Sequence, residues 1–525
     1  MKARPLWQSD ALLAIATLGA CALCTGPLIA ILIGALHAGW SGQGLQLNGN
    51  LFRAMLGSAQ LLLMGAGVAT LLGMASALLV SLCAFPGRKL FAILLAAPLA
   101  APAYVLAYAY GGLMAPGGPL AVLGWDNQAR TAFIHALAFY PYVYLATRAA
   151  LTGRSIAVLE AARSLGAGPW RVLWRVTLPL ARPGIAAGAA LAAMESLADY
   201  GASSYFGASS LATGVFHAWY ALSSPGLALQ LSAILLLAAL ALLCLEQRSR
   251  TGSLAATGTQ RTHALARYAL SARAGLAAAL ACAALIGLAA LLPLGWLIRL
   301  ALLDGSDWGK LIAPLIRSLS LAGLGAGLTL AVSISIAILA RKGGAIGRLG
   351  ARFSLLGYAV PGAVMALGTL AGLGFFRKLG WIGGIGGLAS LGILLWAYCA
   401  RFAATGLGPV AAGLTRISPS QDFAARGLGA GPIRRVLRLD LPMVRPSMAI
   451  AALIVFVEIL KELPATLILR PLDWDTLAVR AHAYAADERL VQAAAPALLI
   501  TLAGALSLAL AGRVLAVPPQ QGPQA

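Results

Sequence analysis

The sequence predicts an all-α polytopic membrane protein with about 12 transmembrane helices, arranged as two six-helix halves that repeat in parallel orientation. The first reason is composition: of 525 residues, 60% are hydrophobic and 10% are charged, and the mean hydropathy is +0.86. Soluble proteins carry roughly 25% charged residues, so this chain needs lipid as its surroundings. The other two reasons are a series of long apolar runs and a duplicated polar loop.

Apolar runs of the length that an α-helix needs to cross the hydrocarbon core recur along the whole chain. The first run has no signal-peptide cleavage pattern behind it, so we expect it to remain as an anchor. The fifth and eleventh runs carry acidic residues. We expect spans near residues 11–37, 54–83, 90–114, 131–152, 184–203, 226–245, 274–303, 315–340, 353–375, 383–412, 447–463 and 490–512.

The positive charge follows the loops between these runs. A net charge of +22 in a soluble protein would indicate nucleic-acid binding, but here the 38 Lys and Arg residues lie mainly in short loops. With the N-terminus in the cytoplasm, 27 of them fall on cytoplasmic segments, Arg401 included, and 11 on external ones. We therefore expect both termini to be cytoplasmic and the partner surface to be the lipid bilayer, with no nucleic acid.

The cysteines and histidines show no ligand spacing. All six cysteines lie in or at the ends of apolar runs, which predicts neither a disulfide framework nor a metal site. We expect no metal and no cofactor in this chain. The residues are Cys21, Cys24, Cys83, Cys244, Cys282 and Cys399, with His37, His135, His217, His263 and His482.

A polar segment occurs twice. Residues 160–184 align without a gap onto 423–447, at a constant offset of 263, with 14 of 25 positions identical. Six spans separate equivalent points, so the second half inserts with the orientation of the first, around a pseudo-two-fold axis along the membrane normal. The same offset pairs further residues: Glu195 with Glu458, Asp199 with Glu462, and Thr213 with Thr476.

The repeat divides the chain into two domains. We expect a first six-span domain at 1–245 and a second at 274–525, joined by a solvated cytoplasmic linker at 246–273. Each domain contains one copy of the repeated loop, at 153–183 and at 415–446.

Each repeated loop is predicted to be a helix-turn-helix element on the cytoplasmic side. A Gly-X-Gly-Pro break separates two helical stretches, and Pro179 and Pro183 are expected to end the second helix before the membrane. On this second helix, three- and four-residue spacing predicts one packing face and one charged face. The packing face is Trp170, Leu173, Trp174 and Leu178, and the charged face is Arg171 and Arg175. A simple interfacial helix in a positively charged loop is the alternative.

The loop resembles the EAA loop of importer-type ABC permeases, whose pattern is Glu-Ala-Ala, three residues, Gly, nine residues and Ile-X-Leu-Pro. Val176 replaces the Ile in the first copy; the second copy has Phe423 in place of the glutamate, with Asp422 before it. The resemblance implies a type I importer fold and a loop that docks on a separate ATP-binding subunit. The residues that it assigns to coupling are Glu160, Ala161, Ala162, Gly166, Pro179, Asp422, Ala424, Ala425, Gly429 and Pro442.

Later segments are similar to the fused twelve-span permeases of ferric-iron importers, whose relatives include thiamine permeases. These segments are residues 193–201, 457–466, 473–480 and 486–489. The similarity implies a bacterial inner-membrane location, ferric iron as the solute, a periplasmic binding protein, and two copies of an ATP-binding subunit that binds the ATP.

Four acidic residues, Glu195, Asp199, Glu458 and Glu462, are predicted to face one another across the pseudo-two-fold axis, as a pathway or gate. One hypothesis makes them oxygen ligands for a trivalent cation in transit. The other gives Glu195 and Glu458 a helix-locking role and lets Asp199 and Glu462 contact the binding protein.

The chain has no GxxxxGK[ST] phosphate-binding loop, so we expect it not to be an enzyme. Two rival classes remain at this point. A secondary transporter would use the membrane carboxylates as ion sites but leaves the duplicated loop unexplained. A channel or scaffold would have no energy coupling.

Overall fold

The computed structural model describes residues 6–40, 49–151, 154–250, 267–303, 308–342, 344–354, 356–357, 360–378 and 387–516. Most of the expected linker, 251–266, and the expected start of the first loop at residue 153 lie outside these residues. The division into domains at 245 and 274 stays a prediction.

Helices make up nearly all of the first half. They are α1 (Leu6–Trp40), α2 (Gly49–Gln60), η1 (Leu61–Ala66), α3 (Gly67–Leu82), α4 (Arg88–Leu94), η2 (Ala97–Ala100), α5 (Ala103–Met114), η3 (Ala121–Leu123), α6 (Asn127–Ala150), α7 (Arg154–Ser164), α8 (Pro169–Val172), η4 (Leu173–Thr177), α9 (Leu178–Ala198), α10 (Gly201–Phe206), α11 (Leu211–Phe216), η5 (His217–Ala221) and α12 (Pro225–Arg250). The short strand β1 (Cys83–Ala84) pairs in parallel with β2 (Tyr268–Ala269).

The second half has the same character. Its helices are α13 (Ala272–Ile286), η6 (Gly287–Leu291), α14 (Leu292–Leu303), α15 (Gly309–Lys342), α16 (Gly344–Ser354), α17 (Gly362–Lys378), α18 (Gly387–Leu414), α19 (Pro419–Gly427), α20 (Pro432–Arg435), η8 (Val436–Asp440), α21 (Leu441–Leu460), α22 (Pro464–Leu469), α23 (Leu477–Ala486) and α24 (Leu490–Ala516).

Long apolar helices confirm an all-α polytopic membrane protein. Within the described ranges nine helices are long and apolar enough to cross a membrane, or ten if one bent pair forms a single span, so the number twelve is not confirmed. Two predicted spans have no counterpart in this set. Helix α6 covers the span at 131–152, but its buried face carries His135 and two threonines and packs against protein. Helix α17 covers only part of 353–375 and has 17 residues.

The predicted third span, 90–114, is not one straight helix. Its two parts, Arg88–Ala100 and Ala103–Met114, meet at 91°. Pro98 and Pro102 flank the break, and Ala101 between them is extended. Proline lacks an N–H group and disfavours helical geometry in the residue before it, so hydropathy alone overlooks this break.

The expectation that Pro179 and Pro183 end a loop helix is wrong. The chain stays helical from Pro169 to Ala198, through the π-helical segment η4. A π turn is wider than an α turn, which relieves the contact between a following proline ring and the carbonyl one turn earlier. The segment η8 precedes Pro442 in the same way in the second half.

The first span of each half packs against the other half. Helix α1 lies against α17 and α16, and the indole N–H of Trp396 donates to the Leu23 carbonyl at 2.8 Å. Likewise α14 of the second half packs against α5 of the first, and the Tyr110 hydroxyl donates to the Leu288 carbonyl at 2.7 Å. The two halves therefore share one interlocked core.

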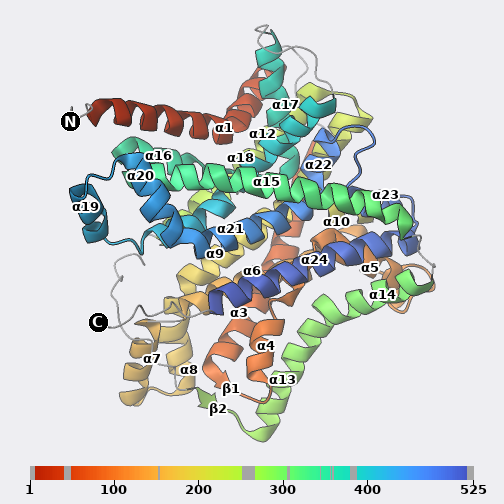
Figure 1. The fold of residues 1–525 in the computed structure, drawn as a ribbon. Helices are drawn as coiled ribbons and strands as arrows, with labels where there is room; N and C mark the ends of the chain where they lie inside the picture. Colours follow the sequence, from red (N-terminus) through yellow and green to blue (C-terminus); the bar gives the residue numbers. More distant parts are fainter. Residues whose placement is uncertain are drawn as a thin grey trace.

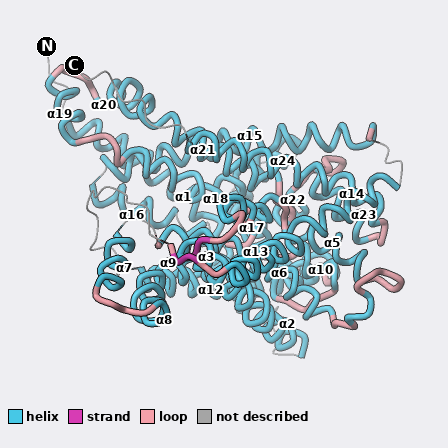
Figure 2. Tube along the Cα trace, turned by 90° about the horizontal axis from the view of Figure 1, so that it is seen from below, coloured by secondary structure: helices cyan, strands magenta, loops and turns pink. Residues whose placement is uncertain are grey.

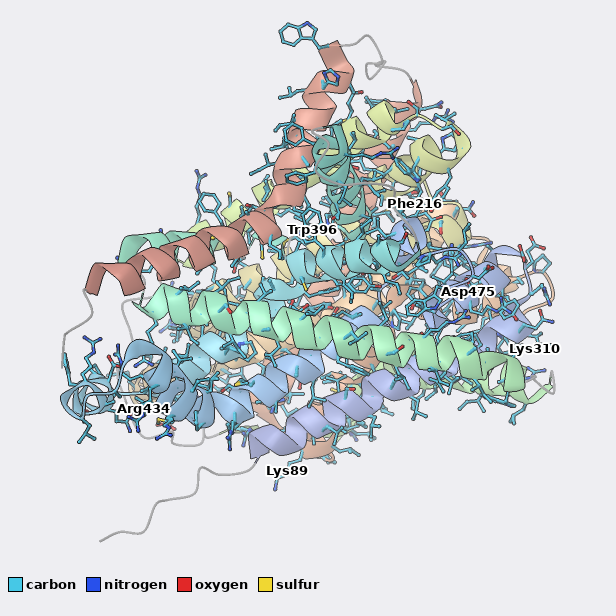
Figure 3. The ribbon with its side chains drawn as sticks, turned by 45° about the horizontal axis from the view of Figure 1, so that its top comes forward. Lys89, Phe216, Lys310, Trp396, Arg434 and Asp475 are labelled. Carbon is cyan, nitrogen blue, oxygen red and sulfur yellow. The ribbon has the colours of Figure 1, made fainter. Side chains whose placement is uncertain are left out.

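Both copies of the repeated loop lie at the same end of the bundle, as a parallel repeat requires. Figure 1 shows α7 and α8 and the pair α19 and α20 on the left, with α10, α14 and α23 on the right, and Figure 2 gives the same separation from another direction. Arg434 lies at the loop end, whereas Lys310 and Asp475 lie at the opposite end (Figure 3).

The residue register between the halves changes toward that opposite end. Thr476 caps α23, and the residue that caps α11 is Ser210, not the expected Thr213. The first N–H of each helix donates to an equivalent serine of a long span, Leu211 to Ser58 at 2.8 Å and Leu477 to Ser318 at 2.7 Å. The offset of 263 residues therefore holds from the loops to Asp199 and Glu462 but not at the caps of α11 and α23.

The close crossing of α1 and α17 depends on Gly368. A Cβ atom there would lie 2.3 Å from the Pro27 carbonyl oxygen, a backbone atom that cannot move aside alone. We expect Gly368→Ala to lower the free energy of unfolding by about 1–3 kcal/mol through overpacking. Denaturant unfolding in mixed micelles measures it. Gly374→Ala on the same helix is the matched control, because no atom lies within 4 Å of its Cβ position; equal effects of the two substitutions would contradict this packing.

Candidate functional site

The two repeated loops have the same backbone geometry. Gly166 and Gly429 follow the first helix of each loop with φ angles of 81° and 76°, a conformation that favours glycine. The next residue donates its N–H back to the end of that helix, from Ala167 to Ala162 at 3.1 Å and from Ala430 to Ala425 at 3.0 Å. These contacts form a Schellman-type cap, so the predicted glycines have a defined structural task.

The cap turns one leucine of each loop outward. Leu165 and Leu428 stand at equivalent positions and are 88% and 87% exposed. Trp174 and its equivalent Leu437 are also exposed, at 66% and 59%. Each loop thus presents apolar side chains at the same places, although neither packs them against its own chain.

The packing face predicted for the first loop is wrong in part. Trp170 and Trp174 are exposed, whereas Val172 is buried and packs with Leu82 and Leu159. Of the residues predicted to pack, Leu173 does lie against this cluster.

Asp422, which precedes the missing motif glutamate, forms contacts within the second loop. Its carboxylate accepts hydrogen bonds from Arg426 at 2.8 Å and from Arg435 at 2.9 Å. Burial would raise the pKa of Asp422, but the hydrogen bonds from Arg435 and Arg426 and their positive charges outweigh it and hold the pKa below its usual value. The ion pairs therefore persist at neutral pH, while Phe423 beside them is exposed.

A cavity of about 100 Å³ lies where α9 and α21 end, and it brings the four acidic residues together. Its lining also includes aromatic side chains from the first half and two cations from the second half. The charged residues of the lining are Glu195, Asp199, Glu458, Glu462, Arg401 and Lys461.

Asp199 closes the break between α9 and α10. Its carboxylate accepts the backbone N–H of Ser203 at 2.9 Å and that of Ala202 at 3.3 Å, which caps the new helix. The ring of His135, on α6, lies 3.1 Å from the same carboxylate and 2.8 Å from the Ser196 hydroxyl. With a side chain only 8% exposed, Asp199 is not accessible to a docking protein, contrary to the second hypothesis above.

Glu462 performs the same task in the second half. Its carboxylate accepts the backbone N–H of Ala465 at 2.8 Å, at the start of α22, and forms an ion pair with Arg401 of α18. The Thr466 hydroxyl donates to the Glu462 carbonyl at 2.9 Å. The Glu462 side chain is 4% exposed, so it also is held inside the bundle.

Glu195 and Glu458 differ in their partners. Glu458 accepts a hydrogen bond from Lys461 at 3.0 Å, one turn further along the chain. Among the described residues, Glu195 has no assigned hydrogen bond or ion pair, although it lines the same cavity. No group of three or more His, Cys, Asp or Glu side chains within the described ranges is arranged to hold a metal ion.

Sequence reasoning missed the residues that balance these carboxylates. The assignment of Arg401 to a cytoplasmic segment is wrong, because it lies near the middle of α18. His135 was not assigned any role, and Lys461 was not recognised as the partner of Glu458. One signal was available: ionisable residues inside apolar runs are costly and need partners.

Three tyrosines of the first half, of which Tyr104 lines the cavity, make contacts with the second half. The Tyr108 hydroxyl lies 2.9 Å from Nδ1 of His482, and the Tyr104 hydroxyl donates to the Lys461 carbonyl at 3.3 Å. The Tyr220 hydroxyl donates to the Leu467 carbonyl at 2.9 Å. All three contacts join the first half to the second.

A polytopic helical bundle with a polar cavity between its halves and two matched loops at one end defines a membrane permease. Residues 69–247 match the family described as "Binding-protein-dependent transport system inner membrane component". This match covers about a third of the chain, which over most of its length is similar to a fused permease of an ABC importer.

Individual relatives carry different solute names. The molybdenum transport system permease protein ModB of Escherichia coli (strain K12) is 35% identical over 135 residues, which are 24% of this chain and 58% of ModB. The Fe(3+)-transport system permease protein FbpB 2 of Haemophilus influenzae is 23% identical over 438 residues, 82% of this chain and 84% of that protein. The chain thus spans little more than half of ModB but most of FbpB 2.

The ion pair between Arg401 and Glu462 should carry a large share of local stability. Removal of one partner of a buried pair leaves the other charge without compensation, and we expect Arg401→Leu to cost about 3–5 kcal/mol of unfolding free energy. Chemical unfolding in bicelles measures it. The double variant Arg401→Leu/Glu462→Leu should recover part of the loss. Lys461→Leu is the milder control, because its partner Glu458 has a side chain that is 30% exposed. A single Arg401 variant as stable as the native chain would contradict this account.

Proposed function

We propose that the chain forms the translocation pathway of an ATP-driven importer, powered by two copies of a separate ATP-binding subunit. The observation that carries this proposal is the matched turn at Gly166 and Gly429, which exposes Leu165 and Leu428 to nearly the same extent. Placement of a loop in the cytoplasm requires only positive charge. It does not require that both loops have the same helix cap and an exposed leucine at the same position. Two equal subunits that dock on these loops would need both.

The partners follow from this arrangement. The loops face the cytoplasm, where the ATP-binding subunits dock, and both termini lie on that side. A solute-binding protein docks at the opposite end, near Asp475, and the membrane is the bacterial inner membrane. The chain itself binds neither ATP nor another cofactor, since the sequence lacks the phosphate-binding loop.

The mechanism uses the continuous helix of each loop. From Pro169 to Ala198 the chain is one helix of 30 residues that ends directly before Asp199. ATP-driven closure of the two subunits would draw the loops together, and each rigid helix would carry that displacement to the cavity. The cavity then opens toward the binding protein, accepts the solute and resets after hydrolysis.

We further propose that the solute is ferric iron. The relative that covers most of the chain is named as an Fe(3+) permease, and the cavity lining has four carboxylates against the two cations Arg401 and Lys461. Hard oxygen ligands suit a trivalent cation. Molybdate is the second candidate, supported by the similarity to ModB and by those same two cations. A gradient-driven mechanism has less support, because it leaves the matched loops unexplained. Thiamine is a third candidate solute of the same class of importer.

Charged substitutions at the outward leucines test the docking. Leu165→Glu and Leu428→Glu should each weaken association with the ATP-binding subunit by at least about tenfold, because each would place a charge at the centre of an apolar contact. Binding of the purified subunit to the chain in nanodiscs measures it. Leu472→Glu is the matched control, a leucine that is 95% exposed on the opposite end. Docking that is unchanged in both loop variants, or equally reduced in the control, would refute the importer proposal.

Removal of one cavity charge tests the solute. In proteoliposomes with the ATP-binding subunit and a loaded binding protein, Glu195→Gln should slow uptake of radioactive ferric iron about tenfold, since it removes a cavity carboxyl group that has no assigned partner among the described residues. Glu488→Gln, an exposed carboxylate outside the cavity lining, should leave uptake unchanged. Uptake of radioactive molybdate in place of iron would overturn the choice of solute but not the importer itself.

A further inference from the structure

The first loop contacts Tyr268, near the end of the expected inter-domain linker, 246–273. The Nε atom of Arg163 donates to the Tyr268 hydroxyl at 3.1 Å, and the guanidinium group lies 3.9 Å from the centre of the Tyr268 ring. Tyr268 belongs to β2, which pairs with β1 at the end of α3 (Figure 1). One tyrosine thus connects the loop, the linker end and a membrane span.

The inner contact of the first loop is apolar. Leu159 on α7 and Val172 on α8 are 0% and 1% exposed, and both pack with Leu82 at the end of α3. The Tyr268 ring lies against the same cluster. This part of the loop is therefore tied to the body of the protein by buried apolar surface.

The second loop has charges at the equivalent positions. The offset of 263 relates Leu159 to Asp422 and Val172 to Arg435, so the apolar pair is replaced by an ion pair of 2.9 Å. The equivalent of Arg163 is Arg426, which turns toward Asp422 at 2.8 Å instead of toward a tyrosine. Helix α19 buries none of its residues.

These two kinds of contact respond differently to salt. The Debye length falls from about 10 Å at 0.1 M ionic strength to about 3 Å at 1 M, so a partly exposed ion pair weakens while apolar packing does not. The Asp422 and Arg435 side chains are 18% and 12% exposed, which leaves them within reach of ions.

We propose that the two loops are fixed unequally: Tyr268 positions the first loop as a stiff element, whereas the Asp422–Arg435 ion pair holds the second as a compliant, salt-sensitive one. The inequality itself needs no partner. Its consequence rests on the proposed function, because two identical ATP-binding subunits would then meet one stiff and one yielding loop, and ionic strength would act on coupling through the second loop alone.

Hydrogen exchange of the full chain in lipid nanodiscs tests the proposal without any partner. Between 0.05 and 1 M NaCl, amides of 419–435 should exchange about fivefold faster, while those of 154–172 should not change. Asp422→Leu/Arg435→Val, which copies the residues of the first loop, should remove the salt response. Asp422→Asn, a smaller change, should remove it as well if the double variant does not insert.

Tyr268 is tested in the same experiment. Tyr268→Ala should speed exchange in 154–172 several-fold and leave 419–435 unchanged, and Tyr268→Phe, which keeps the ring under Arg163, should restore most of the protection. Equal salt responses of the two loops, or an unchanged first loop in Tyr268→Ala, would overturn the proposal. Hydrogen exchange is measured on the chain without a partner, so it tests this proposal separately from the proposed function. Failure of the ATP-binding subunit to dock on the native chain would count against the proposed function only.

Discussion

The arrangement of the bundle depends on two carboxylates, Asp199 and Glu462, that lie inside it where long spans stop. A buried carboxylate without partners costs several kcal/mol, and in a membrane no bulk water is available to lower that cost. The break in the helix lowers part of this cost, because the short helix that follows donates backbone N–H groups to the carboxylate. The remaining compensation comes from a side chain of a neighbouring helix, His135 or Arg401. The neighbours α6 and α18 are thereby fixed against α9 and α21.

The two halves meet this requirement with different residues. The sequence offset relates His135 to Tyr398, whereas the cation of the second half stands three residues later, at Arg401. One helical turn separates the two positions, so either side chain reaches a carboxylate on the same face. Tyr398 keeps a polar role beside it, with its hydroxyl 2.6 Å from that of Thr466. Duplication has preserved the acidic ends of the spans more strictly than the groups that neutralise them.

The acidic residues repeat between the halves and their partners do not, which explains why only the acidic residues could be predicted from the sequence. The sequence repeat identified the loops, because their backbone geometry permits only a few residue types, such as glycine and proline. The same offset of 263 residues also paired Asp199 with Glu462. Hydropathy found the lipid-facing spans for an equally direct physical reason. Hydropathy also placed α6, although the number of spans is not confirmed, and it overlooked the bend at Pro98 and Pro102, which does not lower the hydrophobicity of the span. Arg401 was missed because an isolated charge between two apolar stretches looks like a loop until its partner is known.

The prolines near the loops are a local sequence signal that predicts the wrong structure. Pro179 and Pro183 are typical helix terminators in isolation, yet a π turn before them lets the helix continue. The consequence is mechanical: 30 residues form one element about 45 Å long, with an exposed tryptophan near one end and a buried carboxylate just beyond the other. If the turn ended the helix as expected, movement of the loop would be absorbed by a flexible joint at the membrane surface. With a continuous helix, any displacement of the loop also displaces Asp199 relative to His135, so the same carboxylate that fixes the fold is the one that the loop can move.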